Sequence, residues 1–258
     1  MLILNKNILT IGGNRLEGGP LTPPTPPGPI PLPPNTVRVR TNDGNVPYKD
    51  QYATYQTATL VQGTTDVYDV YRSGTSLNNL LYKSTNIVEL LGANTTGITN
   101  MKQMFDSCTS LTSVTLFDTS SVTNMNTMFY GCKSLTSVPL FDTSNASDTG
   151  GMFSSCSSLT DVPLFDTSNV TDMSYMFSLC NSITIVPLFN TYKVTNMAGM
   201  FAHCRYVQSG ALALYQQAST QTNPPSKHGN TFYNCGISTT TGKAELAQIP
   251  SSWGGRGA

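Results

Sequence analysis

The stretch FDTSNVTDMSYMFSLCNSITIVPL, residues 165–188, is one copy of a unit that returns every 24 residues without insertion. The Met-Phe-x-x-Cys motif of this unit begins at Met104, Met128, Met152, Met176 and Met200. Self-similarity at a fixed period of this length is typical of units that cannot bury an apolar face alone and therefore stack into one continuous core. We expect the function of such a chain to lie on an exposed surface and not in a cleft.

The first half of each unit has the apolar spacing of a helix. In one copy the apolar residues follow one another at intervals of three, three, one and three positions: Val122, Met125, Met128, Phe129 and Cys132. These intervals place all of them on one side of an α-helix. The pattern therefore predicts a helical arm in every unit.

The second half of the unit carries the segment Leu135-x-x-Val138-x-Leu140. Equivalent segments start at Leu111, Leu159 and Ile183. The spacing is that of the strand in a leucine-rich repeat, although Pro139 cannot donate to a strand ladder and must keep the strand short. Together the two halves predict an α/β solenoid of leucine-rich repeats with a 24-residue period, a small β-rich N-terminal cap and a helical C-terminal cap.

A Phe-Asp-Thr-Ser corner joins the two halves, beginning at Phe117, Phe141 and Phe165. An Asp at such a corner accepts hydrogen bonds from backbone amides two residues further on. A column of calcium sites is the alternative, but Asn94 and Asn190 occupy the same position without charge, and closely spaced ligands are not evident. We therefore expect turns and no metal site.

The chain begins with two segments of unusual composition. Residues 1–18 predict an anchor hairpin, with a frayed terminus as the alternative. Its candidate anchor residues are Leu2, Leu4, Ile8 and Ile11. Residues 19–35 carry nine of the 16 prolines and predict an extended stalk, because polyproline II rises about 3.1 Å per residue.

The rest of the chain divides into a repeated part and two caps. Residues 36–76 alternate between polar and apolar side chains and predict a β-rich N-terminal cap. The repeats occupy residues 77–212, starting with a degenerate copy. Residues 213–258 form the C-terminal cap, with a helix predicted over 211–218 and another over 243–248.

Five of the six cysteines occupy the same position of the repeat. The sixth, Cys235, follows Phe232 with the same Phe-x-x-Cys spacing. No two of them lie close enough in sequence for a Cys-x-x-Cys metal pair, and stacked side chains that point the same way disfavour disulfide geometry. We expect free thiols that pack as small apolar groups in the core.

The amino-acid composition of the chain argues against two classes of binding partner, nucleic acids and membranes. Charged residues make up 11% of the chain, and 14 basic residues balance 14 acidic ones, so we expect no binding to nucleic acid and no insertion into a membrane. His203 and His228 are the only histidines, and no nucleophile or paired carboxylate accompanies them. The sequence predicts a protein that is not an enzyme and needs no cofactor.

The repeat, clearest over residues 165–188, resembles the BspA-like leucine-rich repeats of bacterial surface proteins, and the C-terminal cap is similar to the ending of related proteins from gut bacteria and their phages. This resemblance implies adhesion to host proteins, mucins or other cells, without enzymatic activity. It implies no particular ligand-contact residues. The N-terminus lacks the uninterrupted apolar region of a secretion signal, which favours a virion over a cell wall as the location.

Three functions remain open at this point. The first is a virion-displayed adhesion module in a phage decoration or fibre protein, with residues 1–18 docked on a virion protein and the repeats contacting a glycan or protein of a mucosal or bacterial surface. The second is a BspA-type adhesin on the bacterial cell surface or in the extracellular medium. The third is a structural decoration protein without a ligand. A homo-oligomer would add avidity to the first two.

The candidate binding surface consists of the positions that vary between copies while their neighbours stay apolar: Ser113, Ser137, Asp161 and Ile185. Variation at exposed positions of a repeat permits recognition of a partner.

Overall fold

The computed structural model describes residues 4–5, 8–11, 14–16, 31–47, 49 and 51–257. The chain falls into two compact units, Met1–Pro31 and Leu32–Ala258. Three short strands of the first unit pair antiparallel in chain order: β1 (Leu4–Asn5), β2 (Ile8–Ile11) and β3 (Asn14–Leu16). Leu2, residues 17–30 and the side chains of Leu4, Ile8 and Ile11 lie outside the described residues, so the anchor and the stalk stay predictions.

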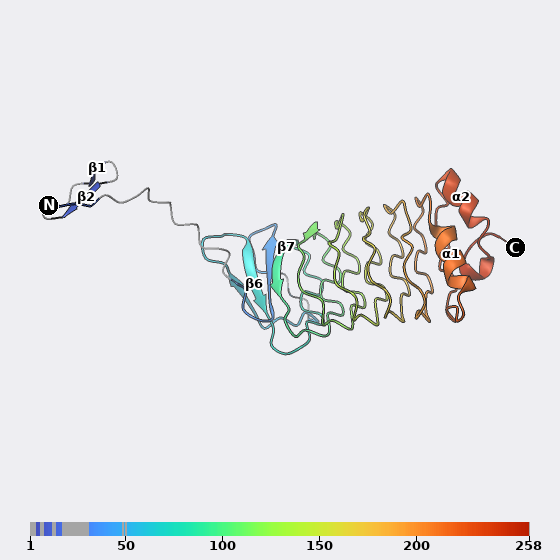
Figure 1. Cartoon of the computed structure of the whole chain (residues 1–258), viewed down its shortest axis with the longest axis horizontal. Coiled ribbons are helices and arrows are strands. Elements are labelled where there is room, and N and C mark those ends of the chain that lie inside the picture. Colours follow the sequence, from blue (N-terminus) through green and yellow to red (C-terminus); the bar gives the residue numbers. More distant parts are fainter. Residues whose placement is uncertain are drawn as a thin grey trace. The chain divides into compact units, whose positions relative to one another are not determined.

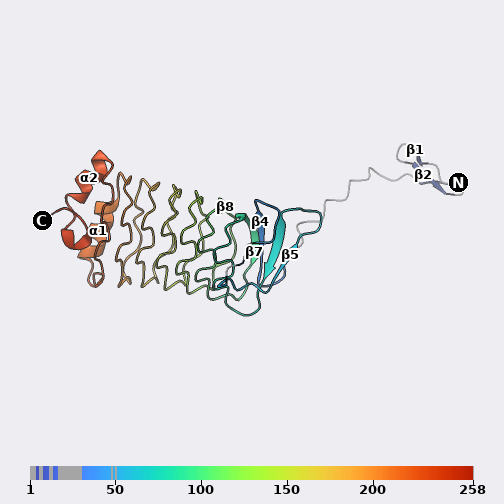
Figure 2. The same ribbon diagram turned by 180° about the vertical axis from the view of Figure 1, so that it is seen from behind.

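The second unit begins with a five-stranded mixed sheet (Figures 1 and 2). Its strands are β4 (Thr36–Thr41), β5 (Thr57–Leu60), β6 (Val67–Tyr71), β7 (Ile87–Asn94) and β8 (Ser113–Val114). They lie in the order β5-β6-β4-β7-β8, antiparallel except for the parallel pair β7 and β8. Val37 and Val39 of the central strand β4 are fully buried, so one face of this sheet packs on the core.

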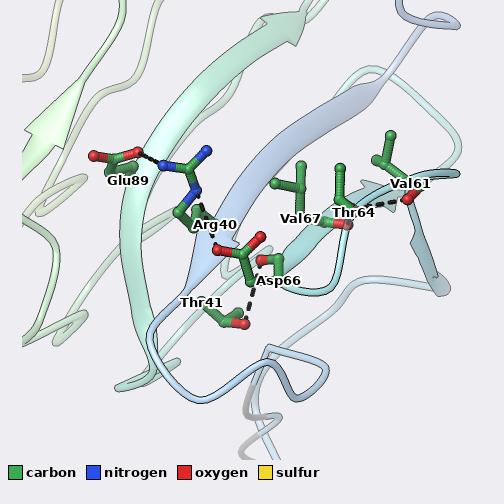
Figure 3. Close-up of polar contacts among 7 residues, drawn as sticks. All are labelled: Arg40, Thr41, Val61, Thr64, Asp66, Val67 and Glu89. Atoms are coloured by element: carbon green, nitrogen blue, oxygen red, sulfur yellow. Dashed lines mark hydrogen bonds and ion pairs between the residues drawn. The ribbon is translucent and has the colours of Figure 1, made fainter.

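Ion pairs link the middle strands of the sheet on its other face. The guanidinium of Arg40 on β4 lies between the carboxylates of Glu89 and Asp66, at 3.0 and 3.4 Å (Figure 3). Arg38 makes a two-pronged contact with Asp69 at 2.7 and 2.8 Å. Because these groups are partly exposed, they contribute little to stability. The pairs with Asp69 and Glu89 join β4 to particular residues of β6 and β7 and support the strand register.

The prediction of an α/β solenoid of leucine-rich repeats is wrong. The regular structure of the second unit is the open five-stranded sheet, two helices, α1 (Ala211–Thr220) and α2 (Thr240–Leu246), and a 3-10 turn, Ser251–Trp253. The predicted helical arms are absent from the repeated part of the chain, all of which is described. Its five copies, here numbered one to five, run from the end of β7 to the start of α1 as stacked irregular turns, with β8 in copy one (Figure 1): 93–116, 117–140, 141–164, 165–188 and 189–212.

Left-handed residues interrupt every predicted helical arm. In copy two, Thr127 and Gly131 have φ angles of 52° and 67°. The equivalent residues of the other copies also have positive φ: Gln103, Ser107, Gly151, Ser155, Tyr175, Leu179, Gly199 and His203. A right-handed helix needs negative φ at every residue. The apolar intervals of three and four therefore predict the correct buried residues but the wrong backbone.

Backbone hydrogen bonds alternate between a copy and its neighbour. The N–H of Met128 donates to the carbonyl of Met125, three residues back, at 3.1 Å, whereas the N–H of Phe129 donates forward to Met152 in the next copy at 2.9 Å. Parallel bridges also connect one position of every copy: Asn100, Asn124, Asp148, Asp172 and Asn196. Tight turns and bonds between copies thus replace the i to i−4 bonds of a helix.

Prolines explain why the strand pattern produces only one short strand. In copy one, the N–H of Thr115 donates to the carbonyl of Leu90 at 3.1 Å, next to the pairing of β7 with β8. Pro139, Pro163 and Pro187 occupy the position of Thr115 in the next three copies and have no N–H to donate. The ladder therefore stops after β8.

A column of phenylalanine rings forms the centre of the repeated part. Neighbouring rings from Phe105 to Phe201 stack with centroids 5.2 to 5.7 Å apart and planes within 15° of parallel. The five cysteines of the repeats form a second column. Each of their thiols donates to a carbonyl 27 residues earlier in the chain, as from Cys156 to Phe129 at 3.1 Å. All six cysteines are free and buried, which confirms their prediction as core thiols.

The C-terminal helices close the stack. Glu245 of α2 accepts hydrogen bonds from the N–H groups of Gly210 and Leu212, at 3.2 and 3.1 Å, and so supplies partners for the N-terminal amides of α1. Gly210, which precedes α1, has a φ of 95°. Trp253 covers the end of the core, where its ring stacks on His228 with centroids 4.3 Å apart.

The contact beneath Gly210 yields a stability prediction. A Cβ at this position would overlap the carbonyl oxygen of Val186, whereas a Cβ at Gly63, with a φ of 81°, would meet nothing within 4 Å. Gly210→Ala and Gly63→Ala should both lose about 1–2 kcal/mol from the left-handed backbone, and only Gly210→Ala should lose a further ~1–3 kcal/mol from overlap. Equal losses for the two variants in urea unfolding would contradict the packing of α1.

The buried thiols yield a second prediction. Burial raises the pKa of Cys156 and Cys204 from 9.0 to about 12, and only the thiolate reacts with disulfide reagents. The native protein should therefore resist Ellman's reagent at mildly alkaline pH, and all six thiols should react after unfolding. Because the folded pKa is raised, the free energy of unfolding should also fall between pH 9 and 12. Rapid labelling of the native protein would show that the core is misassigned.

Candidate binding surface

The four predicted surface residues lie where the sequence analysis expects them, at exposed positions. Ser113, Ser137, Asp161 and Ile185 are all exposed, one in each of copies one to four. Parallel pairing relates this position to its neighbours, with Glu89 opposite Ser113 and Ile185 opposite Ser209. The four residues therefore follow one another along one side of the stack.

Beside them lies a row of exposed leucines that the sequence analysis missed. Each is the last residue of its copy, and their exposed fractions range from 53% to 63%: Leu116, Leu140, Leu164 and Leu188. We call these four residues the leucine row. The strand pattern of a leucine-rich repeat predicts that this leucine points inward, which is wrong here.

A proline precedes Leu140, Leu164 and Leu188 and explains their exposure, whereas Leu116 follows Thr115 and is exposed without one. The N–H of Phe141 donates to the carbonyl of Pro139 at 3.0 Å, and the same tight turn follows Pro163 and Pro187. This three-residue turn buries Phe141 and leaves Leu140 in solvent. The Leu-Phe pair at each junction between copies was the available signal, because the phenylalanine takes the core position that the leucine pattern assigns elsewhere.

Exposed aspartates follow the leucine row two residues further along each copy. Asp118, Asp142 and Asp166 each accept a hydrogen bond from the N–H of the serine two residues on, at 2.9 to 3.0 Å, as the corner motif predicts. Hydrogen bonds from the Ser120 and Ser168 side chains and amides lower the pKa of Asp118 and Asp166. Carboxylates thus border the leucine row.

A separate hollow of about 410 Å³ opens over the turns of copies two to four. Its lining residues are Asn126, Thr127, Tyr130, Gly150, Gly151, Ser154, Ser174, Tyr175, Ser178 and Leu179. The hollow exists because copy three has Gly151 and Ser154 where copy two has Thr127 and Tyr130.

Two residues of this hollow have a strained backbone. Tyr175 and Leu179 have φ angles of 55° and 63°, although left-handed backbone costs a bulky residue about 1–2 kcal/mol. Gly151 and Gly199 occupy the position of Tyr175 in the adjacent copies. Tyr175 and Leu179 are 55% and 43% exposed, so burial in the core does not offset the strain.

Hydrogen bonds hold the floor of the hollow. The carboxylate of Asp148 accepts from the N–H of Gly150 at 2.9 Å and from the amide of Asn126 at 3.1 Å. Asp172 accepts from the N–H and the hydroxyl of Ser174 at 2.8 and 2.6 Å. The polar groups of the floor are therefore fixed before any ligand arrives.

Both histidines pack against aromatic rings. His203 meets Tyr233 edge to face with centroids 5.2 Å apart, and His228 stacks on Trp253. Among the described residues, no three His, Cys, Asp or Glu side chains gather closely enough to hold a metal ion. Within the same residues, no helix combines the length and apolar character needed to cross a membrane.

Comparison with known proteins places the repeated part of the chain in a family. No curated protein and no solved structure matches the chain. A family model described as "Mycoplasma protein of unknown function, DUF285" matches residues 75–184 and again residues 159–220. The two matches together span more than half of the 258 residues, and the chain therefore belongs to this DUF285 family.

Proposed function

We propose that this protein is a non-enzymatic adhesion module, displayed on a virion, that attaches to a protein of a bacterial or mucosal surface. The observation that carries the proposal is the leucine row: four large apolar side chains, each more than half exposed, at one repeated position. Contiguous apolar groups that stay in water mark interaction sites on proteins. The resemblance to BspA-like surface proteins supports the same role.

Because the copies are evenly spaced, the four leucines form a line that an extended peptide segment of the partner could follow. Paired strands lie about 4.8 Å apart, so the four leucines span roughly 14 Å. Removing one leucine side chain from water contributes about 1.5–3 kcal/mol. Four weak contacts in register would therefore provide a specific interaction without a deep pocket.

Charge defines the partner further. Asp118, Asp142 and Asp166 border the row, in a chain with few charged residues. A partner with apolar side chains next to lysine or arginine would pair with both features. Ser113, Ser137, Asp161 and Ile185 lie on the same part of the surface. Because Asp161 and Ile185 differ from the two serines, they would fix the register of the partner.

The order of segments supports display on a virion: a short three-stranded sheet, a proline-rich segment and the repeats. The description of the family names Mycoplasma, which favours a bacterial surface adhesin as the second candidate. The binding chemistry would be the same for both. Mass spectrometry of purified virions separates them, since only the first predicts the protein in the particle.

The leucine row is tested by removing its apolar surface. The full chain carrying Leu140→Ser and Leu164→Ser should bind intact gut bacteria or mucin about a hundredfold more weakly than the unaltered protein. Its free energy of unfolding should change by less than about 0.5 kcal/mol per substitution, because both side chains are exposed. Binding is measured as saturable retention of labelled protein, with a bare surface for comparison.

Leu60→Ser is the matched control, since Leu60 is 48% exposed on strand β5, outside the row. It should bind like the unaltered protein. If the unaltered protein, correctly folded, binds neither bacteria nor mucin, the adhesive role is wrong and a decoration protein without a ligand is the better description. Equal weakening by Leu60→Ser would show that the row has no special part in binding.

A further inference from the structure

We propose that the hollow over copies two to four is a binding site for a neutral sugar unit of a glycan. The proposal rests on the adhesive role proposed above, for which it supplies a second class of ligand. The site is separate, because none of its lining residues belongs to the leucine row or to the bordering aspartates.

The lining of the hollow selects an uncharged ligand. All ten lining side chains are neutral, and they include the amide of Asn126 and the hydroxyls of Ser154 and Ser178. No lysine or arginine lines the site to hold a phosphate or a sulfate. A neutral molecule with many hydroxyl groups matches this set of donors and acceptors.

The aromatic residues select a ligand that also has an apolar face. Tyr130 and Tyr175 border the hollow from different copies and are 40% and 55% exposed, with Leu179 beside them at 43%. A pyranose ring presents C–H groups on its faces and hydroxyls around its edge. Such a ring can contact a tyrosine while its hydroxyls reach the polar floor.

Copy four carries large side chains at two positions whose backbone is left-handed in every copy. Tyr175 and Leu179 both adopt left-handed backbone at exposed positions that glycine occupies in other copies, Gly199 and Gly131. A Cβ on Gly199 would overlap the Tyr175 ring, so the glycine leaves room for the tyrosine. Because Thr127, Ser155 and His203 share this conformation, the bulk of the side chains and not the strain distinguishes copy four.

The size and the rigidity of the site agree with this ligand. Its volume of about 410 Å³ lies in the range of about 300–1,000 Å³ that small-molecule sites occupy. The Asp148 and Asp172 carboxylates hold the loops beneath it through bonds to Gly150 and Ser174. A floor that is already ordered loses little entropy when a weakly held sugar binds.

The test is saturation-transfer NMR on the full chain with maltotriose, chitotriose and N-acetyllactosamine as neutral probes and sialyllactose as the charged comparison. At least one neutral probe should show saturable transfer. Tyr130→Ser and Tyr175→Gly should each weaken its binding by about tenfold. Both variants use residues found at the same positions of other copies, Ser154 and Gly199, and should therefore fold.

Two further variants make the outcome decisive. Tyr192→Ser removes an exposed tyrosine outside the hollow, at a position where other copies have serine, and should leave sugar binding unchanged. Ser154→Tyr places a ring in the hollow at the position of Tyr130 and should abolish binding, even if Tyr175→Gly were to unfold.

No saturable transfer from any neutral probe, or equal binding by the unaltered protein and Ser154→Tyr, would overturn the sugar site. In that case the protein could still be retained on bacteria or mucin through the leucine row. Failure of the sugar site is therefore distinguishable from failure of the adhesive role.

Discussion

The structure depends on one alternation of backbone hydrogen bonds. Within the turns of each copy, one N–H closes a tight turn, as Met128 does, and the next donates to the following copy, as Phe129 does to Met152. This pattern connects the five copies to one another at the same offset, and it continues from Phe201 to Thr231 across seven additional residues. The stacked phenylalanines, the thiol column and the leucine row all follow from the fixed offset.

In the first half of each copy the sequence was sufficient to predict which residues are buried but not the backbone that buries them. Val122, Met125 and Met128 lie at intervals that suit a helix, and the same intervals bring them to the core through consecutive turns. What separates the two is the left-handed backbone at Thr127 and Tyr175. Neither residue type favours that conformation, so no local preference revealed it.

The binding surface was predictable only in part. Exposure of Ser113, Ser137, Asp161 and Ile185 followed from variation between copies, but the adjacent leucine row was hidden by a pattern that assigns its leucines to the core. The tight turns after Pro139, Pro163 and Pro187 expose three of the four leucines, and Leu116 is exposed without such a turn. The hollow forms where the small residues of copy three lie beside larger residues of the neighbouring copies. It could not be predicted until the stacking of the copies was known.

Far-UV circular dichroism of the full chain distinguishes copies built from stacked turns, joined by bonds between neighbours, from copies that contain helices. Helices α1 and α2 contain 10 and 7 residues, so the account predicts a weak helical signal, well below a tenth of the chain. A helical content several times larger would require a helix in each copy. That result would contradict the turns, and with them the leucine row and the hollow.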